Sequence, residues 1–297
     1  MSFSSMPGIG STMPGIGSTI PGIGSTTKGI RNLGNTCYIS ATLQCLYRCD
    51  VFCETLENLE KLGPVTSLLT DIFRKMSEGS DVDVFNMISA LRRRPSSFLD
   101  YRCQNDAQEF FLELLDAIEN ECRDLGVPDA TSVFYGKITY LTRCENCKNI
   151  TRRIEPFASL SFSGSYPWSR ESIDDFQCDH CNGRHRAERE GKIIVAPKIL
   201  VIQVLRFDGN GRKSNHLIDP PTTMDLGPVH LESMKRRIEV PYASKGVVCH
   251  EGFSLHRGHY YSLHRNQLWV RCDDEFVTMQ DSISKEEPYV LFYEFQR

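Results

Sequence analysis

The sequence predicts an α+β fold in which helices precede strands along the chain. Up to about residue 125, apolar side chains recur at the spacing of a helix, in segments bounded by Asp, Gly or Pro. After Val133 the chain changes to short runs rich in β-branched and aromatic residues, which are typical of strands. Because helices come first and strands later along the chain, α+β organisation is predicted.

The predicted helices differ in how clearly the sequence marks them. They cover residues 35–49, 65–76, 83–93 and 106–125. The first is apolar on every side, which predicts a buried helix. The last is the clearest, because Asp106 and Glu109 form a start that resembles a capping box. Gly126 and Pro128 then end it.

The second half of the chain contains the predicted strands. Each is a short run of β-branched, aromatic or aliphatic residues between polar or turn-forming segments. They cover residues 137–142, 193–195, 199–207, 247–249, 260–264, 268–271, 276–279 and 289–295.

The first 27 residues differ from the rest of the chain. They contain no charged residue and no Cys, and the heptad (M/I)PGIGST is repeated in tandem from Met6 to Thr26. Its Pro and Gly residues prevent regular helix or strand, and one Ile per repeat cannot build a core. We therefore expect a disordered leader, residues 1–27, before one folded domain, residues 28–297. A docking segment for a partner is the alternative.

Composition limits the class of protein. Hydrophobic residues make up 40% and charged residues 24% of 297 residues, which are ordinary globular values. A net charge of −4 gives no electrostatic reason to expect nucleic acid as a partner. No apolar stretch is long enough to span a bilayer, and no basic segment with an apolar run marks a signal peptide. We therefore expect a soluble intracellular protein with reduced thiols.

A cysteine opens the first predicted helix. The positive end of the helix dipole at Cys37 stabilises a thiolate, which is one way to obtain a nucleophile at neutral pH. Asn32 and Asn35 precede it, and either amide could donate to a developing oxyanion. We expect Gly34 to let another backbone come close. A buried structural cysteine explains the local pattern equally well, so both interpretations stay open.

A histidine and two acids form the second candidate group. A catalytic thiol needs a base within hydrogen-bond reach, and the base needs a group that fixes its tautomer. His259 starts one predicted strand and Asp273 follows the next, so the two could meet across a hairpin turned near Asn266. Gly258 favours His259 because it leaves room beside the ring. The alternative histidines include His250, His256 and His264.

Two Cys-x-x-Cys pairs form the third candidate group. The pairs are Cys144 with Cys147 and Cys178 with Cys181. In a reduced compartment, four thiolates in two such pairs are the preferred ligands of structural zinc. The long gap between the pairs predicts that they lie at the tip of an extended hairpin. A redox pair or chance is the alternative, and His180 or His185 could replace one thiolate.

Together these motifs resemble the ubiquitin-specific protease family of deubiquitinases. The resemblance covers about residues 28–297. It begins with Gly-Ile-Arg-Asn-Leu-Gly-Asn-Thr-Cys-Tyr, which is similar to the Cys box of the family, and ends with a His box and a closing strand. The matching segments are residues 29–46, 104–111, 200–207, 258–260, 269–274 and 289–293.

The resemblance implies an architecture and a site. The architecture would be papain-like, with a helical thumb, a β palm and β fingers whose zinc-tipped ends grip ubiquitin. The four cysteines match the finger zinc site. Cys37 would be the nucleophile, His259 the base and Asp273, in preference to Asp274, the orienting carboxylate. Asn32 corresponds to the oxyanion-hole side chain. Asp106 matches a position that contacts the basic C-terminal tail of ubiquitin in some members.

The expected function is therefore hydrolysis of the bond after the C-terminal Gly of ubiquitin. Two alternatives stay open: the same chemistry on a ubiquitin-like modifier, and a catalytically silent scaffold that binds ubiquitin. The expected partners are ubiquitin and ubiquitinated proteins, without nucleic acid or membrane. We expect a monomer in the cytoplasm, with a nuclear pool as a further option.

Overall fold

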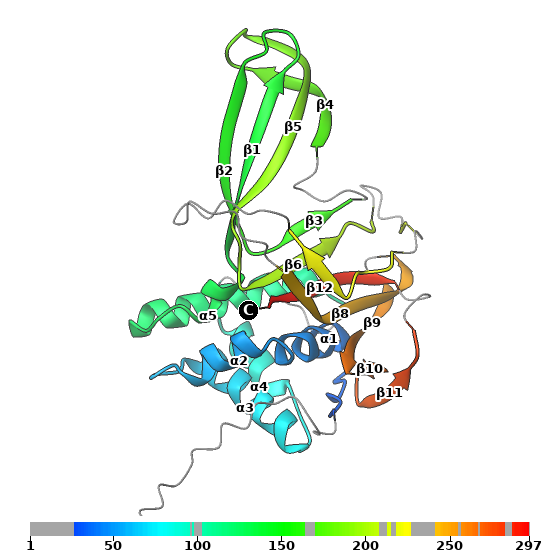
Figure 1. Ribbon diagram of the computed structural model, residues 1–297. Coiled ribbons are helices and arrows are strands. Elements are labelled where there is room, and N and C mark those ends of the chain that lie inside the picture. The colour runs from blue at the N-terminus through cyan, green and yellow to red at the C-terminus, as the bar shows by residue number, and fades with distance from the viewer. Residues whose placement is uncertain are drawn as a thin grey trace, which may run out of the picture.

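Helices come first and strands follow in the structure, as the sequence predicts (Figure 1). The computed structural model describes residues 27–95, 97, 103–163, 170–207, 213–214, 218–226, 241–254, 257–266, 268–282 and 287–296. The predicted leader lies outside the described residues, except for Thr27. None of the described helices combines the length and the apolar character that crossing a membrane requires.

The helices pack together on one side of the molecule. They are α1 (Cys37–Tyr47), α2 (Asp50–Glu57), α3 (Pro64–Glu78), α4 (Phe85–Arg92), α5 (Ala107–Leu125) and a short 3-10 helix (Ala130–Phe134). In α1, every residue from Cys37 to Leu46 is buried, which confirms the predicted buried helix. Periodicity did not predict α2, because this short helix buries only Phe52 and Leu56.

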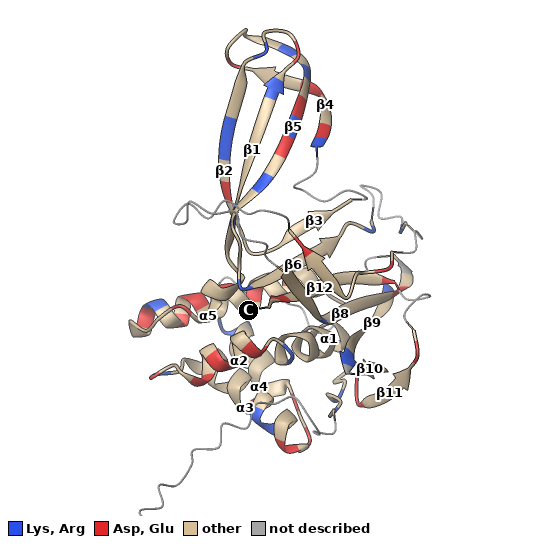
Figure 2. Cartoon of the chain, in the orientation of Figure 1, with Lys and Arg blue, Asp and Glu red and all other residues tan. Residues whose placement is uncertain are grey.

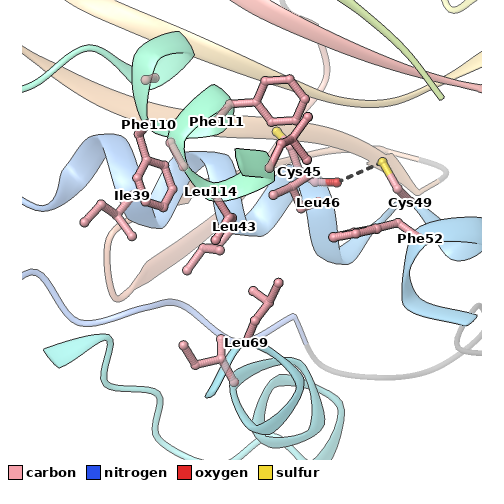
Figure 3. Packing of buried hydrophobic residues seen from close by; sticks show 14 of the residues in the cluster. Ile39, Leu43, Cys45, Leu46, Cys49, Phe52, Leu69, Phe110, Phe111 and Leu114 are labelled. Atoms are coloured by element: carbon pink, nitrogen blue, oxygen red, sulfur yellow. Dashed lines mark hydrogen bonds between the residues drawn. The ribbon is translucent and has the colours of Figure 1, made fainter. Parts of the chain in front are cut away.

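Helix α5 has the boundaries that its sequence predicts. Asp106 is the N-cap, and its side chain accepts hydrogen bonds from the backbone N–H groups of Gln108, at 2.8 Å, and Glu109, at 3.0 Å. Gly126 ends the helix with a φ of +66°, in the left-handed region that glycine occupies without steric cost. Figure 3 shows α5 residues Phe110 and Leu114 beside the buried side chains of α1.

An eight-stranded sheet packs against α1. Its strands are β3 (Leu160–Phe162), β6 (Ile199–Val204), β7 (Thr223–Asp225), β8 (Pro241–Ser254), β9 (Arg257–Asn266), β10 (Leu268–Asp273), β11 (Phe276–Gln280) and β12 (Pro288–Phe295). The order is β11-β10-β9-β8-β12-β6-β3, with β7 paired to β8. Helix α1 contacts β8, β9 and β10, so the start of α1 and the β9–β10 hairpin lie close together.

A second, four-stranded sheet rises from the β3–β6 edge of the first (Figure 1). Its strands are β1 (Gly136–Cys144), β2 (Ile150–Phe157), β4 (Arg170–Cys178) and β5 (Gly183–Val195), in the order β2-β1-β5-β4. We call it the finger sheet. Lys, Arg, Asp and Glu residues are spread along its strands (Figure 2). All its pairings are antiparallel, and both Cys-x-x-Cys turns lie at its far end.

Candidate active site

Cys37 is the first residue of α1 and is buried. The unpaired backbone N–H groups and the positive dipole of a helix N-terminus favour a thiolate at this position. Gly34, just before the helix, has a φ of +124°, and a Cβ built there would have no neighbour within 4 Å. The expectation that Gly34 makes room for another backbone is therefore wrong. The glycine is needed because L side chains rarely adopt this backbone conformation.

His259 and Asp273 meet across the β9–β10 hairpin. The hairpin pairs Leu268 with Asn266 and Cys272 with Ser262. This register brings His259 Nε2 to 2.5 Å from Asp273 Oδ1. The carboxylate of Asp274 lies farther away, with Oδ2 at 4.0 Å from the same nitrogen.

The His259 ring also interacts with Cys37. A hydrogen bond with the Cys37 thiol is the largest cause that raises the pKa of His259, to about 9. Burial opposes this shift, and the hydrogen bond with Asp273 adds to it. Because Nε2 faces Asp273, Nδ1 is the ring nitrogen left for the thiol. At neutral pH the ring is therefore a cation, held between Cys37 and a carboxylate.

Arg271 holds the second oxygen of Asp273. Its Nη2 lies 2.9 Å and its Nε 3.3 Å from Asp273 Oδ2. The guanidinium also stacks on the ring of Tyr261, 3.5 Å from the ring centroid. Burial would raise the pKa of Asp273, but the hydrogen bonds from His259 and Arg271 hold it below its usual value. Asp273 thus stays ionised and fixed in orientation.

Asn32 is held by Asp274. Its Nδ2 donates to Asp274 Oδ2 at 2.8 Å, and its Oδ1 accepts from the backbone N–H groups of Gly34, at 2.9 Å, and Thr36, at 3.2 Å. Burial raises the pKa of Asp274, against the hydrogen bond from Asn32. The two adjacent acids therefore do different work: Asp273 contacts His259, and Asp274 fixes the amide near Cys37.

Asp106 is 7% exposed and both its carboxylate oxygens have partners within the chain. Oδ1 caps α5, and Oδ2 accepts from the hydroxyl of Tyr289. The structure thus gives this residue a role in holding the start of α5. Its contact with a ubiquitin tail stays a prediction.

Sequence reasoning missed Gln104 and assigned a wrong reason to Gly258. Gln104 Oε1 accepts from the Gly258 backbone N–H at 2.8 Å, and its Nε2 donates to the Gly258 carbonyl. The side chain thereby clamps the peptide that precedes His259. A Cβ on Gly258 would lie 2.2 Å from Nε2 of His250, so the glycine makes room for the buried His250 rather than beside the His259 ring. The only sequence signal for Gln104 is its place in the motif of residues 104–111.

The alternative histidines are unsuited to act on Cys37. Burial lowers the pKa of His250 to about 4 and that of His264 to about 3, so both rings are much weaker bases than His259. His256 lies outside the described residues. Of these histidines, His259 alone has a described hydrogen bond to a carboxylate.

The four cysteines of the finger sheet lie together at its tip. Cys144 and Cys181 have their sulfur atoms 4.0 Å apart, those of Cys147 and Cys178 are 3.6 Å apart, and all four lie within 4.8 Å of one another. Bonds of about 2.3 Å from zinc to four tetrahedral sulfur atoms place those atoms about 3.8 Å apart. The cluster thus fits a structural metal ion with no open coordination position.

The turn geometry matches this cluster, and the two histidines stay outside it. Lys148 and Asn182, which follow the second cysteine of each pair, have φ values of +61° and +52°. These left-handed residues let each turn close around its pair of thiols. The ring of His185 lies 3.3 Å from Asn146 Nδ2, and neither it nor His180 belongs to the described cluster.

Comparison with known proteins decides the family. A family model described as ubiquitin carboxyl-terminal hydrolase matches residues 28–293. The chain belongs to this family. Ubiquitin carboxyl-terminal hydrolase 23 of Arabidopsis thaliana is 26% identical over 302 residues, which are 89% of this chain and 35% of that protein. Probable ubiquitin carboxyl-terminal hydrolase 9 of Schizosaccharomyces pombe is 32% identical over 244 residues, 69% of this chain and 41% of that protein.

Solved structures share the fold of this ubiquitin carboxyl-terminal hydrolase domain. The SAGA Ubp8/Sgf11/Sus1/Sgf73 DUB module bound to ubiquitin aldehyde matches with a TM-score of 0.73 and 21% identity, over 97% of this chain and 72% of that chain. The expected ubiquitin-specific protease fold is confirmed. Relative to the Arabidopsis and fission-yeast proteins, however, the chain spans less than half of the full length.

Proposed function

We propose that the chain is a thiol-dependent deubiquitinase, which hydrolyses the isopeptide or peptide bond after the C-terminal Gly of ubiquitin. The observation that carries this proposal is the hydrogen-bonded series Cys37–His259–Asp273 at the start of a buried helix. A nucleophile, a base and an orienting carboxylate in this order are what acyl transfer by a cysteine requires. Membership of the family supports ubiquitin as the acyl group.

The reaction follows from the geometry. With the proton held by His259, the Cys37 thiolate attacks the carbonyl carbon, so that a C–S bond forms and the carbonyl oxygen becomes an oxyanion. The Cys37 backbone N–H and an Asn32 amide N–H stabilise that oxygen. One N–H of the Asn32 side-chain amide donates to Asp274, and the second N–H is the one proposed for the oxyanion. The C–N bond then breaks, His259 protonates the leaving amine, and water activated by His259 hydrolyses the thioester.

We further propose that the ion at the four finger cysteines is zinc. A set of four thiolates favours zinc over harder cations, and four protein ligands suit a structural rather than a catalytic ion. Bound there, the ion would tie the β1–β2 turn to the β4–β5 turn. The proposed partners are ubiquitin and ubiquitinated proteins, with the enzyme acting as a monomer in the cytoplasm and also, as an option, in the nucleus.

Electrophilic probes test the proposed function. Ubiquitin with a C-terminal electrophile should form one covalent adduct, which peptide mapping should place at Cys37. Probes made from ubiquitin-like modifiers should react more slowly at the same concentration. Faster reaction with one of them would replace ubiquitin by that modifier. No adduct with any probe, together with measurable ubiquitin binding, would identify a silent scaffold and contradict the proposal.

The pH dependence should show the protonation of His259. Because its pKa is raised to about 9, the ring keeps its proton at neutral pH and loses it as the pH rises through about 9. Above that pH it cannot protonate the leaving amine, so kcat/KM for ubiquitin-AMC should fall with a midpoint near 9. Asp273→Asn removes a negative partner and should move this midpoint to lower pH. An unchanged midpoint in that variant would contradict the assignment.

Arg271→Gln should lower kcat/KM for ubiquitin-AMC about tenfold. The substitution removes charge-assisted hydrogen bonds to Asp273, each worth roughly 1.5–3 kcal/mol. Asp273 then holds His259 less firmly, and part of the lost free energy raises the activation barrier. Arg271→Lys keeps the charge and should lose less. Initial rates of ubiquitin-AMC hydrolysis check this, with thermal unfolding measured on the same variants. A variant with full activity would show that Asp273 is held without Arg271.

A further inference from the structure

A cavity of about 510 Å³ opens beside the reacting groups. Its walls include Asn32 and the β10–β11 turn with Asp273, Asp274, Glu275 and Phe276. This volume lies in the range of about 300–1,000 Å³ that small-ligand sites occupy. The cavity can therefore take a few side chains of a polypeptide, but not a folded domain.

The cavity lies at the end of the sheet away from the fingers. Strand β11 ends the described eight-stranded sheet on one side, and β3 and β6, from which the finger sheet rises, lie at the other end (Figure 1). A ubiquitin conjugate has a folded modifier on one side of the reacting bond and the target polypeptide on the other. The small cavity, next to the pair His259–Asp273 that protonates the leaving amine, suits the target side.

The wall of the cavity carries three acids and one cation. Asp273, Asp274 and Glu275 line it together with Arg271. Arg271 pairs with Asp273 and lies 3.6 Å from Glu251. Glu275 is exposed and belongs to no ion pair between described residues. The wall therefore has an excess of negative charge, which favours a ligand that brings N–H groups and positive charge.

An apolar rim adjoins the acidic wall. Phe276 lines the cavity, is 68% exposed and lies on β11 at the end of the described sheet. It pairs in register with Asp273, which places the rim directly beside the reacting groups. A strand at the end of the described sheet, with an exposed apolar side chain and adjacent charge, is suited to an extended peptide.

We propose, on the basis of the proposed function, that this cavity binds the target polypeptide beside the modified lysine. Its acidic wall selects targets that carry Lys or Arg next to that lysine. Selection acts on the leaving group alone, because the acyl part of every substrate is the same ubiquitin.

The test compares leaving groups that differ only in charge. Ubiquitin is joined through an isopeptide bond to the lysine of a short peptide with Arg on both sides or with Glu on both sides. Wild-type protein should cleave the Arg peptide with a kcat/KM about fivefold higher at low salt, and salt should reduce the ratio. Glu275→Lys, and separately Thr278→Lys, should lower the ratio to about one or invert it. Both positions are exposed, so neither substitution disturbs the core.

Ubiquitin-AMC and a remote charge change provide the controls. Ubiquitin-AMC carries no flanking peptide, so Glu275→Lys should leave its rate unchanged. Glu57→Lys makes the same charge change at the exposed end of α2, beyond the far end of α1, and should leave the peptide ratio unchanged.

Three outcomes would overturn the inference. Equal rates on both peptides, with normal ubiquitin-AMC hydrolysis, would refute target selection and leave the proposed function intact. A slower ubiquitin-AMC rate in Glu275→Lys would place ubiquitin's own tail in the cavity. If wild-type protein did not cleave ubiquitin-AMC, the proposed function itself would fail, and the inference with it.

Discussion

Cys37→Ala is expected to abolish ubiquitin-AMC hydrolysis, with kcat lower by a factor on the order of 10⁴ or more. Without the Sγ atom there is no nucleophile and no thioester can form. The variant also removes the largest cause that raises the pKa of His259, so the ring should titrate at lower pH than in the wild type. Hydrolysis measured at high enzyme concentration, with nuclear magnetic resonance titration of His259, checks both effects.

Cys53→Ala is the matched control. The Cys53 thiol is half-buried in α2, and burial raises its pKa to about 12, so it is protonated at neutral pH and a poor nucleophile. This variant should hydrolyse ubiquitin-AMC at close to the wild-type rate. Retained hydrolysis in Cys37→Ala would place the nucleophile at another residue. Circular dichroism on both variants separates lost chemistry from lost folding.

The parts of the site that the sequence could reveal depend on local geometry. Cys37 was found because it opens a helix, and the meeting of His259 with Asp273 because hairpin strands bring such positions together. Gln104 and Arg271 could not be assigned in this way. Gln104 hydrogen-bonds to Gly258, which is far away along the chain. Arg271 binds the second carboxylate oxygen of Asp273, and only the folded hairpin determines which groups that carboxylate meets.

The same limit applies to the fold. Helix α5 has side-chain and glycine signals at its ends, so its boundaries follow from the sequence. Strands β2 and β4 have no such signals and were missed. Nearly all their residues are exposed or half-exposed, and only Phe157 in β2 and Cys178 in β4 are buried. A strand with two solvated faces has no alternation of apolar and polar residues for sequence analysis to detect.

The exposure of the finger strands also means that the finger sheet has little core of its own. The charged side chains along it pair across strands, as Arg186 does with Asp174 and Arg184 with Asp175. Such pairs on an exposed surface contribute about 0–1 kcal/mol each. The residues described at the tip form no apolar cluster, but they include the four thiols. We therefore expect the bound metal ion to supply most of the stability at the far end of this sheet.

Metal removal should accordingly disorder the finger sheet and spare the thiol site. Cys147→Ser, or treatment with a strong chelator, is expected to reduce the metal content from one ion per chain to none and to speed amide exchange in β1, β2, β4 and β5. Hydrolysis of ubiquitin-AMC should fall more than tenfold if the fingers grip ubiquitin as the sequence leads us to expect, because that binding surface is then lost. Cys37 should still react with iodoacetamide, since α1 and β9 belong to the other sheet and its helices.

His185→Ala distinguishes the effect of losing the metal ion from the effect of any substitution at the tip of the finger sheet. His185 lies beside the cluster and contacts Asn146, but it contributes no ligand to the described set of four cysteines. Its variant should keep one ion per chain and wild-type exchange rates. If Cys147→Ser kept the ion and His185→Ala lost it, the histidine would be the fourth ligand. If Cys147→Ser lost the ion with no change in amide exchange or in hydrolysis, the finger sheet would be stable without metal. The cross-strand ion pairs would then have to contribute far more free energy of folding than exposed pairs ordinarily do.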